Sequence, residues 1–429
     1  MKYDVVIIGA GAAGLMAMKE LLAAGYHVCL LEASVVAGGR IATIEESGFD
    51  QPAETGAEFV HGKLPLTLQL LNKANIEYIP VEGKMIAVEK GKWQKNEAHD
   101  KHWETCMRQL GKLKTDITIG QFLEQFFPGA KFNSLRSAVK RFSEGFDLGD
   151  ITKASALAAQ LEWSHEDETQ YRIPGGYMQL INYLLTACIK QKGVIQYNAR
   201  ASMIEYNKES VVITTNDSRR FEAATLLITV SAGVLQSGEL KFVPVLEANY
   251  VKAIHQLGFG SVIKILLQFK TRFWTKYAGD TGFLISDETI PTWWTQLPLE
   301  NNLLTGWLGG PAATARSGDT EESLLQSALL SLAGIFSLSP DVLRQELVHH
   351  KINCWRNHPY IKGGYSYVTT DSAAAKKVLS HLAEGTVFFA GEALYRGKSQ
   401  GTVEAALQSG RMAAKMIKDV FADKKFPLA

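Results

Sequence analysis

The chain contains 429 residues, with 45 Lys and Arg against 44 Asp and Glu, which leaves a formal net charge of +1. At roughly 100–200 residues per domain, this length suggests two or three domains. With 46% apolar and 21% charged residues, the composition is that of a globular protein and excludes wholesale disorder. Because a near-neutral chain has no field that collects phosphates, we expect no nucleic-acid partner. The 4 cysteines are scattered without a CxxC pair, so neither a metal site nor a disulfide framework is expected.

Nothing in the sequence predicts a membrane segment or a cleavable signal. Residues 3–8 form an apolar run that leads directly into a glycine loop, as the start of a fold does, rather than into a cleavage site. The longest uncharged stretch, 323–340, is interrupted by serines, and a buried amphipathic helix explains it better than a membrane span. We therefore expect a cytoplasmic protein.

The first part of the chain predicts a βαβ unit. Residues 3–8 have the pattern of a strand, 12–24 that of a helix ended by Gly25, and 27–31 that of a second strand. A strand, helix and strand in this order open a parallel sheet.

The rest of the chain mixes helical and strand patterns without an internal repeat. Residues 84–170 begin with a Lys-rich stretch, carry no chemistry-bearing motif and predict amphipathic helices. The elements expected after them are strands at 210–215, 223–230 and 261–269, a helical region, a strand at 387–390 and a last helix over 402–420. Signals of a nucleotide-binding fold stand at both ends, which predicts a discontinuous domain interrupted by insertions.

The loop after the first strand has the sequence Gly9-Ala10-Gly11-Ala12-Ala13-Gly14, a GxGxxG motif. The motif is weak alone, but here it follows an apolar strand, opens a helix and precedes Glu32, which lies 18 residues beyond Gly14. The glycines allow close approach of a pyrophosphate to the helix N-terminus, and Glu32 can accept hydrogen bonds from ribose hydroxyls. The alternative is a glycine-rich turn that binds nothing. The placement of the acid favours a dinucleotide site.

A glycine pair and an arginine, Gly38-Gly39-Arg40, follow this unit, and Arg40 can bind a diphosphate as a planar fork. Together with Glu32, the segment resembles the flavin-dependent amine oxidases of the monoamine and polyamine oxidase type, where it holds FAD. Other segments that resemble this family are Gly56 to Gly62, Arg172 to Gly176, the strand with Ala201 and Ile204, Phe388 to Glu392, and Gly401 to Gly410.

The resemblance implies an α/β fold in which a discontinuous Rossmann-like FAD-binding domain is interleaved with an α+β substrate-binding domain, as in glutathione-reductase-like proteins. We expect residues 1–80, 188–250 and 363–429 to form the FAD-binding domain, and 81–187 and 251–362 to form the substrate-binding domain.

The resemblance also implies which residues contact FAD. These are Gly9, Gly11, Ala13, Gly14, Glu32, Gly39, Arg40, Gly56, Ala57, Ala201, Trp355, Gly391, Glu392, Gly401, Thr402 and Val403. Ala201 would contact the adenine through its backbone, and Glu392 would hydrogen-bond the ribityl or diphosphate region. A helix that begins near Thr402 would direct its positive end at the flavin and stabilise the reduced anion.

Lys264 lies inside an apolar strand, where a buried ammonium is costly and a lysine usually reaches out to water. In the resembling family the matching lysine holds a water at flavin N5 and assists the reaction with O2, which is the role we expect of Lys264. Trp355 and Tyr365 correspond to a Trp against the flavin and one wall of an aromatic cage, whose second wall would be Thr402. His61 corresponds to a residue near the substrate entrance, with a structural histidine as the alternative.

The expected reaction is oxidation of a primary or secondary amine, monoamine or polyamine, by hydride transfer to flavin N5. The imine then hydrolyses, and O2 is reduced to H2O2. Gly364 stands where animal monoamine oxidases carry the cysteine bonded to FAD, so we expect non-covalent FAD. The loop 393–400 departs from the family pattern, so the sequence does not predict which amine is oxidised.

Three different functions stay open beside this one. An L-amino-acid oxidase needs an arginine for the substrate carboxylate, and we cannot place one. A desaturase-type flavoprotein would share the glycine motifs, but the segment around Lys264 argues against it. A flavin-binding scaffold without turnover is less compatible with the presence of Lys264, Trp355 and Tyr365 together.

Overall fold

The computed structural model describes residues 2–94, 101–164, 169–380, 383–397 and 399–424, so that Lys398 of the loop 393–400 lies outside the described residues. The chain opens with the expected parallel unit of β1 (Lys2–Ile8), α1 (Ala12–Leu22) and β2 (Val28–Leu31). Every residue of β2 is buried, as in a strand covered on both faces.

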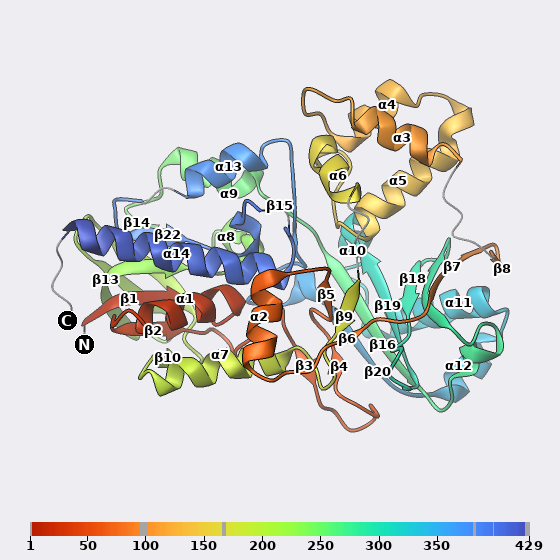
Figure 1. Ribbon diagram of the computed structural model, residues 1–429, viewed down its shortest axis with the longest axis horizontal. Coiled ribbons are helices and arrows are strands. Elements are labelled where there is room, and N and C mark those ends of the chain that lie inside the picture. Colours follow the sequence, from red (N-terminus) through yellow and green to blue (C-terminus); the bar gives the residue numbers. More distant parts are fainter. Residues whose placement is uncertain (1, 95–100, 165–168, 381–382, 398, 425–429) are drawn as a thin grey trace.

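A sheet of eight strands continues this unit (Figure 1). Its strands, in sheet order, are β10 (Val194–Gln196), β2, β1, β13 (Arg220–Ile228), β12 (Val211–Thr215), β11 (Ala201–Tyr206) and β14 (Lys241–Val243), and β22 (Val387–Phe389) pairs with β13. The strands β10, β2, β1, β13 and β22 are mutually parallel. Their carboxyl ends therefore meet at one edge, which is where open α/β sheets bind ligands.

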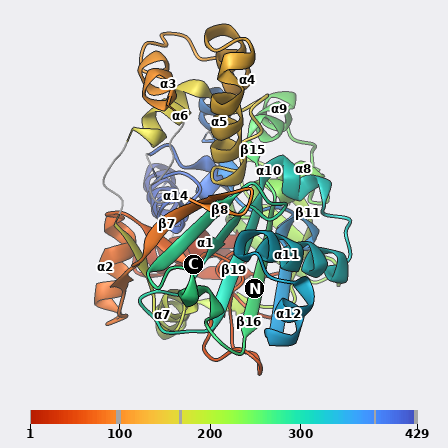
Figure 2. The same cartoon turned by 90° about the vertical axis from the view of Figure 1, so that its right-hand side faces the viewer.

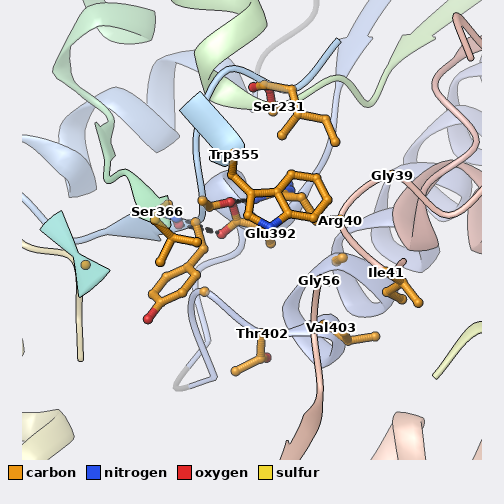
Figure 3. Close-up of a pocket in the computed structure, with 18 of the residues that line it drawn as sticks. Gly39, Arg40, Ile41, Gly56, Ser231, Trp355, Ser366, Glu392, Thr402 and Val403 are labelled. Carbon is orange, nitrogen blue, oxygen red and sulfur yellow. Dashed lines mark hydrogen bonds and ion pairs between the residues drawn. The ribbon is translucent and has the colours of Figure 1, made fainter. Parts of the chain in front are cut away.

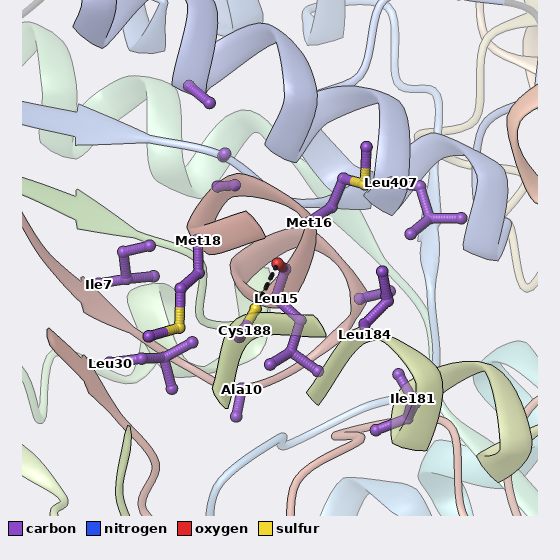
Figure 4. Close-up of a cluster of buried hydrophobic side chains, with 14 of the residues drawn as sticks. Ile7, Ala10, Leu15, Met16, Met18, Leu30, Ile181, Leu184, Cys188 and Leu407 are labelled. Atoms are coloured by element: carbon purple, nitrogen blue, oxygen red, sulfur yellow. Dashed lines mark hydrogen bonds between the residues drawn. The ribbon is translucent and has the colours of Figure 1, made fainter. Parts of the chain in front are cut away.

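Helices cover both faces of this sheet. On one face, α1 lies between α7 (Met178–Lys190) and α14 (Val403–Lys424), and side chains such as Leu15, Leu184 and Leu407 form one buried cluster (Figure 4). The helices that contribute to the cluster of the other face are α8 (Ala232–Ser237), α9 (Ala248–Gln256) and α13 (Ser372–Leu379).

A second sheet of seven strands lies beside the first (Figures 1 and 2). Its order is β20 (Leu347–Cys354), β16 (Val262–Phe269), β19 (Leu303–Gly309), β18 (Thr292–Trp294), β17 (Thr281–Ser286), β7 (Lys84–Glu89) and β8 (Lys92–Trp93). Figure 2 looks onto this part, where α11 (Glu321–Phe336) packs on the sheet beside α12 (Pro340–Glu346) and α10 (Gly310–Ala315).

A group of helices with its own buried cluster stands above the second sheet in Figure 1. It consists of α3 (Trp103–Leu110), α4 (Ile119–Phe126), α5 (Asn133–Gly145) and α6 (Ala156–Trp163). Between the large sheets lie α2 (Pro65–Lys73) and the short strands β3 (Thr43–Ile44), β4 (Ala53–Glu54), β5 (Phe59–His61), β6 (Ile79–Pro80) and β9 (Gln170–Arg172). The remaining short elements are the pair β15 (Gly258–Phe259) and β21 (Ser366–Tyr367) and 3-10 turns at Ala130–Phe132, Phe273–Lys276, Trp355–Asn357 and Glu392–Leu394.

One prediction about secondary structure is wrong, and another is incomplete. Residues 84–89 form β7 rather than part of a helix, because they pair in parallel with β17 from a distant part of the chain. The region after residue 269 contains the expected helices, α10 to α13, but it also supplies the strands β17, β18, β19 and β20, which were not predicted. Short apolar runs of this kind fit a strand or a buried helix equally well until their pairing partners are known.

The domain ranges stay a prediction, and the structure shows where they fall. The strands of the first sheet come from residues 2–31, 194–243 and 387–389. Two of the predicted boundaries cut helices: α7 lies across residues 187 and 188, and α9 across 250 and 251. Both helices pack in the clusters of the first sheet.

In the described part of the chain, no single helix has the length and apolar character of a membrane span; α11 and α12 meet that criterion only as a pair, bent by 112°.

Candidate active site

A cavity of about 1760 Å³ lies where the two sheets and the helical group meet. Its lining includes the residues just after β1, β2 and β13, the start of α14, the strands β16 and β19, and parts of α5 and α6. An ordinary ligand pocket measures about 300–1000 Å³, so this one has room for a dinucleotide and a second molecule.

The glycine loop and Glu32 form one end of the cavity. Glu32 is buried, and its carboxylate accepts hydrogen bonds from the Ala10 N–H and the Ser34 N–H, each at 2.8 Å. Burial raises the pKa of Glu32, and these two N–H groups oppose the rise. A carboxylate has lone pairs left for ribose hydroxyls after two such bonds.

The predicted loop residues do not all face the cavity. Gly9, Gly11 and Ala13 line it, whereas Gly14 does not. A side chain on Gly14 would place its Cβ 2.0 Å from the Gly9 carbonyl oxygen, so the glycine is required for the helix to approach the loop. Ala201, at the start of β11, lines the cavity, and its contact with the adenine stays a prediction.

Arg40 and Glu392, both predicted to contact the cofactor, contact each other (Figure 3). Arg40 Nη1 donates to Glu392 Oε1 at 2.6 Å and to the Gly364 carbonyl oxygen at 2.9 Å. The other carboxylate oxygen of Glu392 accepts a hydrogen bond of 2.5 Å from the Ser366 hydroxyl. Arg40 has five N–H donors, so its remaining donors can still bind a diphosphate while Glu392 fixes the guanidinium.

The N-terminus of α14 also opens on the cavity. Gly401, Thr402 and Val403 line it, and the Thr402 hydroxyl accepts a hydrogen bond of 3.2 Å from the Ala405 N–H. Thr402 therefore caps the helix. The uncapped N–H groups of the first turn and the helix dipole favour negative charge at this position.

These features fit FAD. The starts of α1 and α14 provide two helix N-termini at one cavity. Glu32 provides a carboxylate for the ribose, and Arg40 provides a cation for the diphosphate. Gly39, Gly56, Ala57 and Gly391, which were predicted to contact FAD, line the same space.

Lys264 lies in the middle of β16 between β19 and β20 and is 1% exposed, yet it lines the cavity. Its Nζ donates to the Gly56 carbonyl oxygen at 3.0 Å and to Glu58 Oε2 at 2.7 Å. It therefore does not reach out to water as an edge lysine would.

Glu58 is also bound by Arg172 and by the Trp294 indole N–H, the latter at 3.0 Å. Burial alone would raise the pKa of Glu58, but Lys264 and Arg172 outweigh it and lower the pKa to about 2. The carboxylate is thus ionised at all ordinary pH values.

Aromatic rings form the wall next to Lys264. The Tyr365 ring stacks on Trp307 with centroids 6.3 Å apart, and the Tyr365 hydroxyl donates to the Phe146 carbonyl oxygen. Burial raises the pKa of Tyr365 well above its usual range, so the phenol stays neutral. Trp355 donates its indole N–H to the Thr55 carbonyl oxygen at 2.9 Å and lines the cavity near the Arg40–Glu392 pair (Figure 3).

His61 lines the cavity between Phe59 and Phe146, at centroid distances of 6.0 and 6.3 Å. Burial lowers the pKa of His61 to about 4. The imidazole is neutral at pH 7 and can accept or donate a hydrogen bond but does not repel a cation.

Sequence reasoning missed several residues of this site. Glu58 and Arg172 lie in segments that carry the family resemblance, but no role was predicted for either. Trp307 stands opposite Lys264 in the β16–β19 register, which the sequence did not show because β19 was not predicted. Phe146 and Trp163, which line the cavity from the helical group, come from the region where no motif was expected.

Comparison with known proteins decides the family. A model of the flavin-containing amine oxidoreductases matches residues 12–418. The chain belongs to this family. It is therefore an oxidoreductase, and FAD is its cofactor.

The curated relatives include the human lysine-specific histone demethylase 2, which is 27% identical over 96% of this chain and 53% of its own length. The Arabidopsis thaliana lysine-specific histone demethylase 1 homolog 2 is 28% identical over 96% of this chain and 58% of its own length. The chain thus spans about half the length of the curated relatives it matches.

Solved structures share the fold. A putrescine oxidase double mutant superposes with a TM-score of 0.81 at 19% identity, over 98% of this chain and 99% of that one. The cyclohexylamine oxidase of Brevibacterium oxydans gives a TM-score of 0.81 at 19% identity, over 98% of this chain and 100% of that one. These likenesses confirm the predicted fold class of an FAD-binding part joined to a substrate-binding part.

Proposed function

We propose that the protein oxidises a primary or secondary amine, monoamine or polyamine, with O2 as the final electron acceptor and H2O2 as a product. The observation that carries this proposal is Lys264, a buried ammonium at the wall of a cavity that also receives two helix N-termini. When bound, FAD would supply two-electron oxidation of the amine by hydride acceptance, with O2 as the final acceptor of the electrons.

The residues of the chain have three tasks in this reaction. The N-terminus of α14 favours negative charge in the cavity, as reduction of a flavin requires. Tyr365 and Trp307 form an aromatic surface against which an amine can be oriented. The neutral His61 and the uncharged aromatic wall leave the amine free to bind in its deprotonated form, so that no general base is needed.

Lys264 is proposed to act in the reaction with O2 rather than in amine binding. Its ammonium is already bonded to Glu58 and to the Gly56 carbonyl oxygen, so it presents a fixed positive charge to the cavity. Exchange of Lys264 for Met should slow reoxidation of the reduced flavin by O2 about 100-fold, as loss of one preorganised electrostatic group typically does. Stopped-flow absorbance measures this rate, and an unchanged rate would contradict the role.

A second candidate substrate comes from the relatives. Proteins named lysine-specific histone demethylases align with 96% of this chain, so a methylated lysine side chain is a candidate form of the amine. Such a substrate would release formaldehyde, which a simple monoamine or diamine without N-methyl groups does not.

Oxidation of an L-amino acid has less support from the site. It needs a free arginine near the reacting centre, but the Arg172 guanidinium is bound to Glu58, Gln296 and the Thr295 carbonyl oxygen. Peroxide release measured over monoamines, polyamines, methyl-lysine peptides and amino acids separates these functions. A flavin-loaded protein that gives peroxide with none of them would favour a desaturase or a non-catalytic scaffold.

A further inference from the structure

The carboxylate that binds Lys264 has no role in the proposed reaction so far. An ammonium has three N–H donors, and those of Lys264 reach the Gly56 carbonyl oxygen at 3.0 Å and Glu58 Oε2 at 2.7 Å. Within residues 2–94, 101–164, 169–380, 383–397 and 399–424, Lys264 has no third hydrogen-bond acceptor; its ammonium lies 5.5 Å from the Trp294 ring centroid, and Lys264 lines the cavity. Glu58 thus leaves one donor of Lys264 for whatever the cavity holds.

Glu58 is itself held rigidly. Its Oε1 accepts from Arg172 and from the Trp294 indole at 3.0 Å, while Arg172 also donates to Gln296 Oε1 at 2.7 Å. The side chains of Lys264, Glu58 and Arg172 are 1%, 4% and 5% exposed. This buried group holds two cations and one anion, so Glu58 is the charge that keeps the two cations together.

We propose that Glu58 is a positioning residue that fixes the Lys264 ammonium and directs its remaining N–H into the cavity. This inference rests on the role proposed for Lys264 in the reaction with O2. Glu58 lines the cavity, but both of its carboxylate oxygens are already bound by protein donors, so it acts through the ammonium. The low pKa of Glu58, about 2, agrees with this role, because the carboxylate keeps its charge wherever the enzyme works.

Removal of the carboxylate has a definite consequence. In Glu58→Gln the buried Lys264 and Arg172 would lose the anion that is bonded to both of them and would repel each other more strongly. A guanidinium does not lose its proton in a protein, whereas a buried ammonium does. Lys264 would therefore become neutral and lose its effect on the reaction with O2, and a lower pH would restore it.

One more titratable group acts on this pair. Burial raises the pKa of Glu54 to about 7, and Glu54 interacts electrostatically with both Lys264 and Glu58. Its own titration could change rates near neutral pH. The experiment is therefore repeated with Glu54→Gln in each variant, which removes that titration without touching the Lys264–Glu58 contact.

The test measures reoxidation of photochemically reduced flavin by O2 between about pH 6 and pH 9, without any amine. We expect Glu58→Gln to be about 100-fold slower than the unmodified protein at the alkaline end and within about threefold of it at the acid end. Lys264→Met should be slow throughout. Glu58→Asp should keep most of the rate at every pH, because it keeps the charge.

Two further experiments distinguish a specific effect on Lys264 from a general folding defect of Glu58→Gln. Glu58→Gln with Arg172→Met removes both partners, so Lys264 is no longer repelled and the alkaline rate should recover at least in part. In the flavin-free protein, urea unfolding of Glu58→Gln, of Lys264→Met and of the variant with both substitutions gives the coupling energy between Glu58 and Lys264. The variant with both Glu58→Gln and Lys264→Met should have a urea midpoint no lower than that of Glu58→Gln alone.

The inference is overturned if Glu58→Gln reoxidises as fast as the unmodified protein at all pH values, or is equally slow at both ends. Additive effects of the two substitutions on unfolding would also overturn it. Since no amine is used, these outcomes are independent of whether amines reduce the flavin. If no amine reduced the flavin, the proposed function would be refuted, but the reoxidation rates measured here could still be interpreted.

Discussion

Glu54 and Glu58 are four residues apart, yet their pKa values shift in opposite directions. Burial raises the pKa of Glu54 to about 7, while at Glu58 the same penalty is outweighed by Lys264 and Arg172, which lower the pKa to about 2. The difference arises from partners: Glu54 accepts hydrogen bonds from the Tyr177 N–H at 2.5 Å and the Thr43 hydroxyl at 3.0 Å, which are neutral donors. Environment thus raises the pKa of one acid and lowers the pKa of its neighbour.

Glu54 makes the stability of the protein depend on pH. Its pKa of about 7 in the folded protein exceeds the usual 4.5, so the folded state binds more protons between these values and the free energy of unfolding falls as pH rises through them. Glu54→Gln should remove this loss and stabilise the protein above pH 7 by up to about 3 kcal/mol. Urea unfolding at several pH values measures it, with the exposed Glu45→Gln as control. Parallel pH curves for Glu54→Gln and the unmodified protein would contradict the assignment.

The residue at position 364 bears on whether FAD is bonded covalently to the protein, and here it is a glycine. It lines the cavity, carries no group that could bond to a flavin, and its carbonyl oxygen accepts a hydrogen bond from Arg40. We expect acid precipitation to release the flavin into the supernatant, where its absorbance can be measured. Flavin that remains with the precipitated protein would show a covalent bond elsewhere.

At the scale of elements, α14 joins the cofactor site to the core. Its first turn lines the cavity, and Glu404 in that turn accepts hydrogen bonds from the N–H groups of Leu66 and Thr67 at the start of α2. Further along, a Cβ on Gly410 would lie 2.1 Å from the Ala13 carbonyl oxygen, so α14 and α1 are in close contact. The two helices whose N-termini face the cavity are therefore fixed to each other.

The cap of α14 can be tested alone. The Thr402 hydroxyl accepts from the Ala405 N–H at 3.2 Å and donates to the Ser399 carbonyl oxygen at 2.6 Å. Thr402→Val removes both bonds and should lower the free energy of unfolding by about 1 kcal/mol, whereas Thr402→Ser keeps them. FAD affinity, followed by flavin fluorescence, should fall in the Val variant only. Equal stability and affinity of the two variants would show that Thr402 does not cap the helix.

Elements with local signals were predictable. The β1–α1–β2 unit, β16 and α14 were expected from apolar periodicity and glycine placement, and the structure confirms them within a few residues. The strand β7 was missed because its six residues acquire a strand conformation by pairing with β17, which no local pattern reports.

At the scale of the whole molecule, the site is assembled from residues far apart in the chain. Arg40 and Glu392 are separated by 352 positions, Glu58 and Lys264 by 206, and Glu58 and Arg172 by 114. Family resemblance identified Arg40, Lys264 and Glu392 one by one, but it gave no information on their contacts. The pairing of Glu58 with Lys264 depends on how β16 meets the segment that follows β4, and only the folded chain shows it.

Anaerobic mixing of the FAD-loaded protein with the amine that yields most peroxide tests the central claim most directly. Amine oxidation predicts that the absorbance of oxidised flavin disappears in a single turnover, with one carbonyl product per flavin, and that O2 then restores it with release of H2O2. If no monoamine, polyamine, methyl-lysine peptide or amino acid bleaches the flavin while dithionite does, the protein is not an amine oxidase.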